Sequence, residues 1–379
     1  DKLSAQDIAE AKERLGASLN SGGSADRSSV ALSALSPNLV PSLGLMTEMV
    51  ERPAFAPVEI ERIRSQLLTS IAQAKTTPSS MAARALPALL YGASHPYATT
   101  AMGNEAAVKG FSREQLIGFK DRWLRPDNAE LFVVSDLPLA TLKPILETAL
   151  GSWQAPVGER GIKRFGPLPA RPTTARIVLI DRPGSPQSFI YGGQLTPVDP
   201  RAENTALFAG SDVLGGSTAS RINLELRERR GWSYGAFGFP QLTVAAVPFL
   251  VQAPVQADRT GDSIAALMVQ LRGILGAKGV TDEERVRAVA NSIGGLPGQF
   301  ETGSAVLSAM QTNALYGRPD NYYELLGDRY RALNNGGLDQ ALRQAIDVRG
   351  FVWVVVGEAA KIRPQLEKLK MPIEVIQPR

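Results

Sequence analysis

Residues 214–237 read LGGSTASRINLELRERRGWSYGAF and form the most informative stretch of this 379-residue sequence. Three small residues at 215–217 predict a turn into a helix. A charged cluster that begins at Arg227 ends this helix at Gly231, a residue type suited to the position after a helix C-terminus. Tyr234 then opens a predicted strand. The stretch therefore predicts a helix, a glycine turn and a strand.

The same order occurs near the N-terminus, which indicates an internal duplication. There IAEAKERLGAS, residues 8–18, aligns with INLELRERRGWS, residues 222–233. Three further pairs follow at an offset of roughly 220 to 225 residues. They are LYG at 90–92 and 315–317, FVVS at 132–135 with WVVVG at 353–357, and LKPIL at 142–146 with IRPQL at 362–366. Only two copies exist, so the chain is a duplicated unit and not a solenoid.

The order of predicted elements favours the α+β class. Residues 60–71 carry isoleucine and leucine at helical spacing, and helices are also predicted at 112–123 and 139–150, with a short buried strand at 130–135 between them. In the second half, strands are predicted at 176–181, 188–195, 234–239, 244–253 and 351–356. Helices are predicted there at 202–214, 219–230, 260–276, 281–292, 303–315, 320–333, 338–346 and from 359. Because the elements mix without strict alternation, a doubly wound sheet is not expected.

Residues 154–174, QAPVGERGIKRFGPLPARPTT, form the candidate linker because they are rich in proline and glycine. We therefore predict an N-terminal α+β unit at 1–153 and a C-terminal one at 175–379. The first copy has no counterpart of residues 176–217, so its opening strands are expected upstream of Asp1. The N-terminal unit is therefore expected to be incomplete in this chain.

Composition excludes several classes of function. The net charge of +4 is too small over this length to favour nucleic acid as a partner. The chain has no cysteine and one histidine, His95, so it cannot assemble a two-histidine metal site. His95 lies in a loop-like SHPY string and is expected to be structural. The longest apolar stretch, 244–255, is shorter than the roughly 18 residues that span a bilayer, so no membrane span is expected.

Arg227 and Tyr234 are the candidate catalytic residues. They are separated by a helix end and a turn, so both side chains can project into one cleft. A fixed cation beside a neutral phenol can bind a peptide carbonyl and stabilise the oxyanion that it becomes. The alternative is that the arginines complement the helix dipole and that the tyrosine packs. For 215–217, an anion site at a helix N-terminus is a weaker alternative to a plain turn.

LRERRGWSYGAF resembles the LRExRGLAYS segment of the pitrilysin/insulinase family of zinc metallopeptidases, the inverted HxxEH enzymes. The strings LGASLNSGG, LMTEMVERPAF, SHPYATTAMG, RWLRPDNAELFVVSDL and VLGGSTASRI are similar to family strings in the same order. The resemblance implies two α+β units, each a mixed, largely antiparallel sheet packed with helices, that face each other as a clamshell. It also implies that Arg227 and Tyr234 bind substrate and stabilise the transition state.

The sequence departs from the family at the metal site. The family's HxxEH would fall upstream of Asp1. Its third zinc ligand is a glutamate in a string like LEEI, and here LTSI at 68–71 puts Ser70 in that place. A hydroxyl supplies neither the charge nor the oxygen geometry that a three-ligand catalytic zinc requires. We therefore expect no metal ligand and no cofactor in this chain, with zinc on a partner subunit.

The sequence thus predicts a subunit of a zinc-dependent metalloendopeptidase that degrades peptides or unfolded proteins and is inactive alone. A homologous, HxxEH-bearing subunit would complete a heterodimer, with Arg227 and Tyr234 acting in trans. The alternative is a non-catalytic structural or chaperone-like family member that binds peptides or scaffolds an assembly. The expected location is the periplasm, with the cytoplasm as the alternative, and no nucleic acid is expected as a partner.

Overall fold

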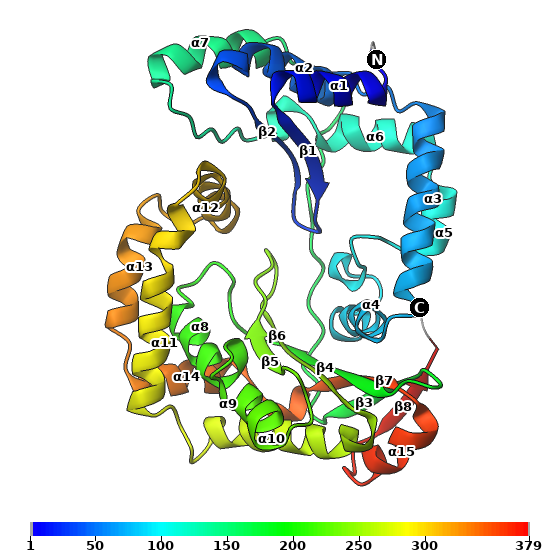
Figure 1. Ribbon diagram of the computed structural model, residues 1–379, viewed down its shortest axis with the longest axis vertical. Helices are drawn as coiled ribbons and strands as arrows, with labels where there is room; N and C mark the ends of the chain where they lie inside the picture. The colour runs from blue at the N-terminus through cyan, green and yellow to red at the C-terminus, as the bar shows by residue number, and fades with distance from the viewer. Residues whose placement is uncertain (1–2, 378–379) are drawn as a thin grey trace. The chain divides into compact units, whose positions relative to one another are not determined.

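A computed structural model describes residues 3–377 of the chain (Figure 1). The chain divides into two compact units. The first contains residues up to 70, residues 101–164 and residues 302–308, and the second contains residues 71–100, 165–301 and those from 309 onward. The unit boundary at 164/165 falls inside residues 154–174, which hold no helix or strand. Residues 71–100, which the sequence places in the first unit, belong to the second.

The first unit is mainly helical. Its helices are α1 (Ala5–Leu15), α2 (Leu39–Glu51), the part of α3 (Pro57–Ala74) up to Ser70, α5 (Glu105–Gly110), α6 (Arg113–Trp123), α7 (Leu139–Leu150) and the start of α12 (Gly303–Tyr316) up to Ser308. Strands β1 (Ser18–Gly23) and β2 (Ser28–Ser33) form an antiparallel hairpin. A small core forms where Leu19, Leu43, Leu45 and Met46 are buried against apolar residues of α1 and α7.

The predicted strand at 130–135 is not formed, and the prediction of a buried strand there is wrong. Leu131 and Val134 are 54% and 43% exposed. Among the described residues of this unit, the strands are β1 and β2, and they pair with each other. Without a neighbouring strand, an apolar run can neither complete its backbone hydrogen bonds nor bury its side chains.

The second unit is built on a six-stranded mixed sheet (Figure 1). Its strands are β3 (Arg176–Asp181), β4 (Gln187–Leu195), β5 (Phe237–Pro240), β6 (Pro248–Gln256), β7 (Val352–Gly357) and β8 (Ile373–Ile376), in the spatial order β5-β6-β4-β7-β3-β8. β3 runs parallel to β7 and β8, and the remaining pairs are antiparallel. β7 lies between β4 and β3 and is buried on both faces, and it lies one residue later than the strand predicted at 351–356.

Helices cover both faces of this sheet. On one face α4 (Pro78–Tyr91) packs on alternate residues of β3 and β7, such as Val178 and Val354, which is why residues 71–100 join this unit. The other face is covered by α8 (Thr205–Ser211), α10 (Thr260–Leu275), α14 (Asn335–Ala345) and α15 (Ala359–Glu367). This unit also contains α11 (Asp282–Gly295), the part of α12 (Gly303–Tyr316) from Ala309 onward and α13 (Tyr322–Arg331). Most predicted helices agree with these bounds, whereas β5 and β6 begin three and four residues later than predicted.

Two of the duplicated strings end in the same glycine turn in both copies, whereas FVVS at 132–135 forms no strand and its counterpart at 353–357 lies in β7. Gly16 and Gly231 end helical segments with φ of 58° and 64°, in the left-handed region that favours glycine. Gly92 and Gly317 follow the ends of α4 and α12 and also have positive φ. These matched turns support the duplication that the sequence indicates. No helix among the described residues is long and apolar enough to cross a membrane.

Candidate functional site

The segment that carries the candidate residues contains two short π-helical stretches. α8 continues as η4 (Asp212–Gly216), and α9 (Arg221–Asn223) continues as η5 (Leu224–Arg229). Such wide turns are rare and often occur at functional sites. The first stretch requires a small residue at Gly215, because a Cβ there would overlap the backbone nitrogen and Cα of Gly238 in β5. The small residues therefore allow a close helix–strand approach, and α9, with three residues, does not provide the N-terminus of a longer α-helix.

Two of the arginines at the end of η5 are held by one buried carboxylate. Glu225 accepts hydrogen bonds from Arg230 Nε at 2.6 Å and from Arg229 Nη1 at 3.3 Å. The Arg230 guanidinium also lies over the Trp232 ring, with its central carbon 4.5 Å from the ring centroid. These contacts give Arg229 and Arg230 structural partners at the helix end, which the sequence did not reveal.

Arg227 differs from its neighbours. Its ion pair is with the adjacent, exposed Glu228 at 3.3 Å, and its side chain is 48% exposed. Its backbone carbonyl accepts from Gly231 N at 3.1 Å, so the turn at the helix end fixes the position of its backbone. The guanidinium is therefore presented to solvent from a fixed backbone.

Tyr234 lies in the loop between η5 and β5 and is 88% exposed. It does not open the strand as predicted, because β5 begins at Phe237. The interpretation of Tyr234 as a packing residue is excluded by its exposure.

The loop around Tyr234 is firmly held. Ser233 Oγ donates to the carbonyl of Pro254 in β6 at 2.6 Å. The side chain of Asn223 accepts from Ala236 N at 3.2 Å and donates to the carbonyl of Thr218 at 2.7 Å. The structure thus displays Arg227 and Tyr234 as exposed donors on one helix–loop–strand segment that ends in β5, an edge strand of the sheet.

Arg221 anchors this segment to α11. Its Nε and Nη2 donate to the two carboxylate oxygens of Glu284 at 2.7 and 2.5 Å, and Nη2 also donates to the carbonyl of Gly279 at 2.8 Å. Burial raises the pKa of Glu284, but the hydrogen bonds from Arg221 and Thr281 outweigh it and leave the pKa lowered. The sequence signal for this residue was its place in the capping box of α11, three residues after Thr281.

Asp212, in η4, is the other perturbed carboxylate of the segment. Burial raises its pKa, and the charge of Arg287 opposes this effect only in part. A Cβ added at Gly216 would lie 3.1 Å from the carboxylate oxygen Oδ1 of Asp212, so a small residue is needed beside it. Sequence reasoning did not single out Asp212.

The histidine that the sequence analysis singled out has structural surroundings. His95 is buried among Tyr91, Tyr97 and Phe165, and its Nδ1 accepts from the backbone N–H of Tyr97 at 3.1 Å, which confirms its predicted structural role.

The residues of this chain do not fit a catalytic zinc site. Ser70 lies exposed on α3, and its hydroxyl stands where the resemblance implies a glutamate ligand. Across residues 3–377, no group of three or more histidine, aspartate or glutamate side chains is placed to hold a metal ion. No step of the chemistry is therefore assigned to a metal on this chain.

Comparison with known proteins identifies the family. Residues 1–103 match the sequence model of Insulinase (Peptidase family M16), and residues 110–292 match that of the Peptidase M16 inactive domain. The chain belongs to peptidase family M16. This family is the pitrilysin/insulinase family that the motifs resemble, so the match confirms the resemblance.

Curated relatives of this M16 chain are named as zinc proteases. An uncharacterized zinc protease of Mycobacterium leprae is 24% identical over 320 residues, which cover 83% of this chain and 70% of the relative. One of Mycobacterium tuberculosis is 26% identical over 320 residues, 83% of this chain and 71% of the relative.

Solved structures show the same fold. A peptidase M16 inactive domain from Pseudomonas fluorescens superimposes with a TM-score of 0.86 at 24% identity, covering 94% of this chain and 84% of that one. A protease from Helicobacter pylori gives 0.82 at 18% identity, covering 94% and 85%. The α+β fold predicted from the sequence is therefore confirmed as that of an M16 chain.

Proposed function

We propose that this chain is the metal-less, substrate-binding subunit of a zinc metalloendopeptidase that acts on peptides or unfolded proteins. In this proposal a second M16 chain with an intact HxxEH motif supplies the zinc, and Arg227 and Tyr234 act in trans on its substrate. The observation that carries the proposal is an asymmetry: the chain displays both donors of the pair, whereas Ser70 stands in place of the zinc-binding glutamate.

The local structure supports a role in binding a carbonyl group. Arg227 presents N–H donors and a fixed charge, and Tyr234 presents one O–H donor. Both are exposed on a segment held by Asn223, Ser233 and Glu225. Donors whose positions are fixed before the reaction stabilise a developing oxyanion more effectively than donors that must reorganise.

The adjacent edge strand supports binding of an extended peptide. β5 pairs with β6 on one side and is the last strand of the sheet on the other. A peptide that adds to a sheet edge gains affinity from main-chain hydrogen bonds, so its binding tolerates many sequences. We expect an unstructured peptide to bind the chain alone with a Kd of about 0.1 to 1 mM.

Isothermal titration of an unstructured peptide against three variants tests the binding step. Arg227→Ala and Tyr234→Phe should each weaken binding. Arg229→Ala is the matched control, because Arg229 lies in the same turn, is more exposed and pairs with Glu225 instead. Identical isotherms for wild type and Arg227→Ala would remove Arg227 from the site.

The rival function is that of a structural or chaperone-like subunit. The match of residues 110–292 to the Peptidase M16 inactive domain supports this alternative. It predicts that a complex with an HxxEH-bearing M16 chain binds unfolded peptides without cleaving them. Hydrolysis by that complex, absent from either chain alone, would support the peptidase proposal over this rival.

A further inference from the structure

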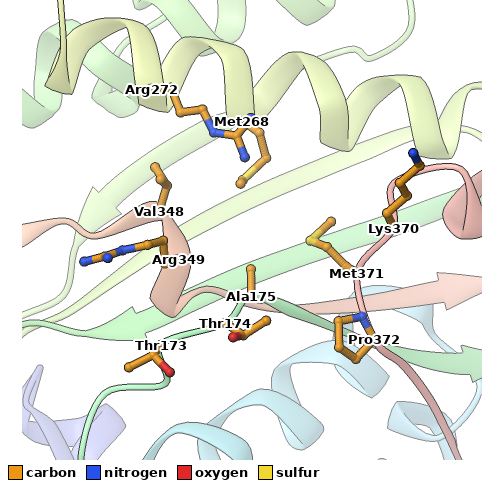
Figure 2. A pocket seen from close by; sticks show the side chains of 10 residues that line it. All are labelled: Thr173, Thr174, Ala175, Met268, Arg272, Val348, Arg349, Lys370, Met371 and Pro372. Carbon is orange, nitrogen blue, oxygen red and sulfur yellow. The ribbon is translucent and has the colours of Figure 1, made fainter.

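A small cavity opens in the second unit where β3 and β7 begin (Figure 2). It has a volume of about 200 Å³ and lies between α10, the turn at 348–350 and the turn that leads from α15 into β8. In the sheet, β3 is separated from β5 by β7, β4 and β6, so the cavity is remote in the strand order from the strand next to Tyr234.

The floor of the cavity is apolar and rich in thioether groups. Met268 of α10 and Ala175 are buried, and Met371 is partly buried against the same core. Methionine side chains are flexible and polarisable, so they adapt to apolar groups of different shapes. The floor can therefore accept a small hydrophobic group.

The rim of the cavity is cationic. Arg272, Arg349 and Lys370 line it, and Figure 2 shows the thioethers of Met268 and Met371 between Arg272 and Lys370. Arg349 is already engaged by Asp347, through contacts of 3.0 and 2.8 Å. Within residues 3–377, neither Arg272 nor Lys370 has a carboxylate partner among the ion pairs of the structure. Two cationic side chains that form no ion pair among the described residues thus flank an apolar floor.

The backbone at Lys370 gives a second, independent indication. Lys370 has a φ of 55°, a left-handed conformation that glycine adopts without strain and that costs energy for lysine. Non-glycine residues in this region cluster at ligand-binding sites, where the side chain is needed in spite of the strain. The backbone amide of Lys370 donates to the carbonyl of Glu367 at 3.2 Å. Because this hydrogen bond of the turn involves only backbone atoms, the turn does not require a lysine side chain.

We propose that this cavity binds a small amphipathic carboxylate, with the apolar part on Met268 and Met371 and the carboxylate between Arg272 and Lys370. The volume is below the usual range for drug-sized ligands, which matches a group of about the size of one apolar amino-acid residue. The end of a peptide and a short fatty acid share this chemistry. An ion without an apolar part, such as inorganic phosphate, would leave the floor unoccupied.

Methyl NMR of the full chain with ¹³C-labelled methionine tests the proposal, because the sequence has seven methionines and two of them line the cavity. Titration with N-acetyl-leucine and with hexanoate should shift the Met268 and Met371 signals saturably, with a Kd of about 1 mM. Whichever of the two binds more tightly identifies the source of the carboxylate. Shifts of equal size with N-acetyl-leucinamide or with phosphate would overturn carboxylate recognition, as would no shift with either acid.

Two variants complete the test. Lys370→Gly and Arg272→Gln should each weaken binding about tenfold, a loss typical of one charge-assisted hydrogen bond. Lys370→Gly should keep or raise the Tm, since glycine relieves the left-handed backbone, so a loss of binding cannot be ascribed to unfolding. Arg363→Gln is the control and should leave binding unchanged, because Arg363 is exposed on α15 and pairs with Glu367. Wild-type affinity in both cavity variants would contradict the proposal.

Discussion

Glu225 and Arg230 form an ion pair of 2.6 Å in which the carboxylate is buried and the guanidinium lies over Trp232. Glu225→Ala should destabilise the chain by about 1–3 kcal/mol, because two arginines lose their shared acceptor at the end of η5. Urea unfolding measures this change. Glu228→Ala, which removes an exposed carboxylate of the same turn, should change the free energy of unfolding by less than about 0.5 kcal/mol. Equal effects of the two substitutions would contradict the assignment.

The pair of Arg221 and Glu284 should make stability depend on pH. The pKa of Glu284 is lowered in the folded chain from its ordinary value of 4.5, so the stabilisation is present above that value and is lost as the pH falls through the folded pKa. Glu284→Gln should therefore cost about 1–2 kcal/mol at pH 7 and less at pH 3. Glutamine keeps the capping box with Thr281, so the substitution isolates the ion pair. Thermal unfolding at both pH values would detect the difference, and a pH-independent cost would contradict this account.

Ionisation of Asp212 should change the stability with pH in the opposite direction to that of Glu284. Burial raises its pKa, so ionisation is less favourable in the folded chain than in the unfolded chain, and stability falls as the pH rises through the folded pKa. Asp212→Asn should raise the Tm at pH 8 and change it less at pH 4, where the wild-type carboxyl is more fully protonated. Asp258→Asn is the control, because Asp258 is highly exposed. A lower Tm for Asp212→Asn at pH 8 would show that the charge is needed.

Gly215 should be intolerant of any side chain. A Cβ would overlap the backbone of Gly238, which cannot move without displacing β5. Gly215→Ala should cost about 1–3 kcal/mol in the free energy of unfolding. Gly294→Ala, in α11, meets no atom within 4 Å and should stabilise the chain by about 0.5–1 kcal/mol through helix propensity. Denaturant midpoints compare the two, and a neutral Gly215→Ala would refute the close approach.

The sequence was sufficient to predict features that depend on local pattern. Hydrophobic periodicity placed most helices and the strands β3, β4 and β7, and the positive φ of Gly16 and Gly231 agrees with the repeated helix–glycine string. The prediction of a buried strand at 130–135 was wrong because an apolar run indicates a preference for burial. It does not indicate whether neighbouring strands are present to bury it.

The site was less predictable than the fold. Motif resemblance singled out Arg227 and Tyr234, and the structure separates Arg227 from the arginines held by Glu225 through its partner, the exposed Glu228. The contacts that position the segment join residues far apart in the chain, such as Arg221 with Glu284 and Gly215 with Gly238. No local pattern reports such contacts, because they depend on how distant elements pack.

The most direct test of the proposed function is the kcat/KM for peptide hydrolysis by this chain in complex with an HxxEH-bearing M16 chain from the same organism. Arg227→Ala and Tyr234→Phe in this chain should each lower kcat/KM about a hundredfold, the loss expected for one oxyanion donor, and Arg229→Ala should leave it within about twofold. Unchanged kcat/KM in both Arg227→Ala and Tyr234→Phe complexes would contradict the claim that this chain contributes the two donors.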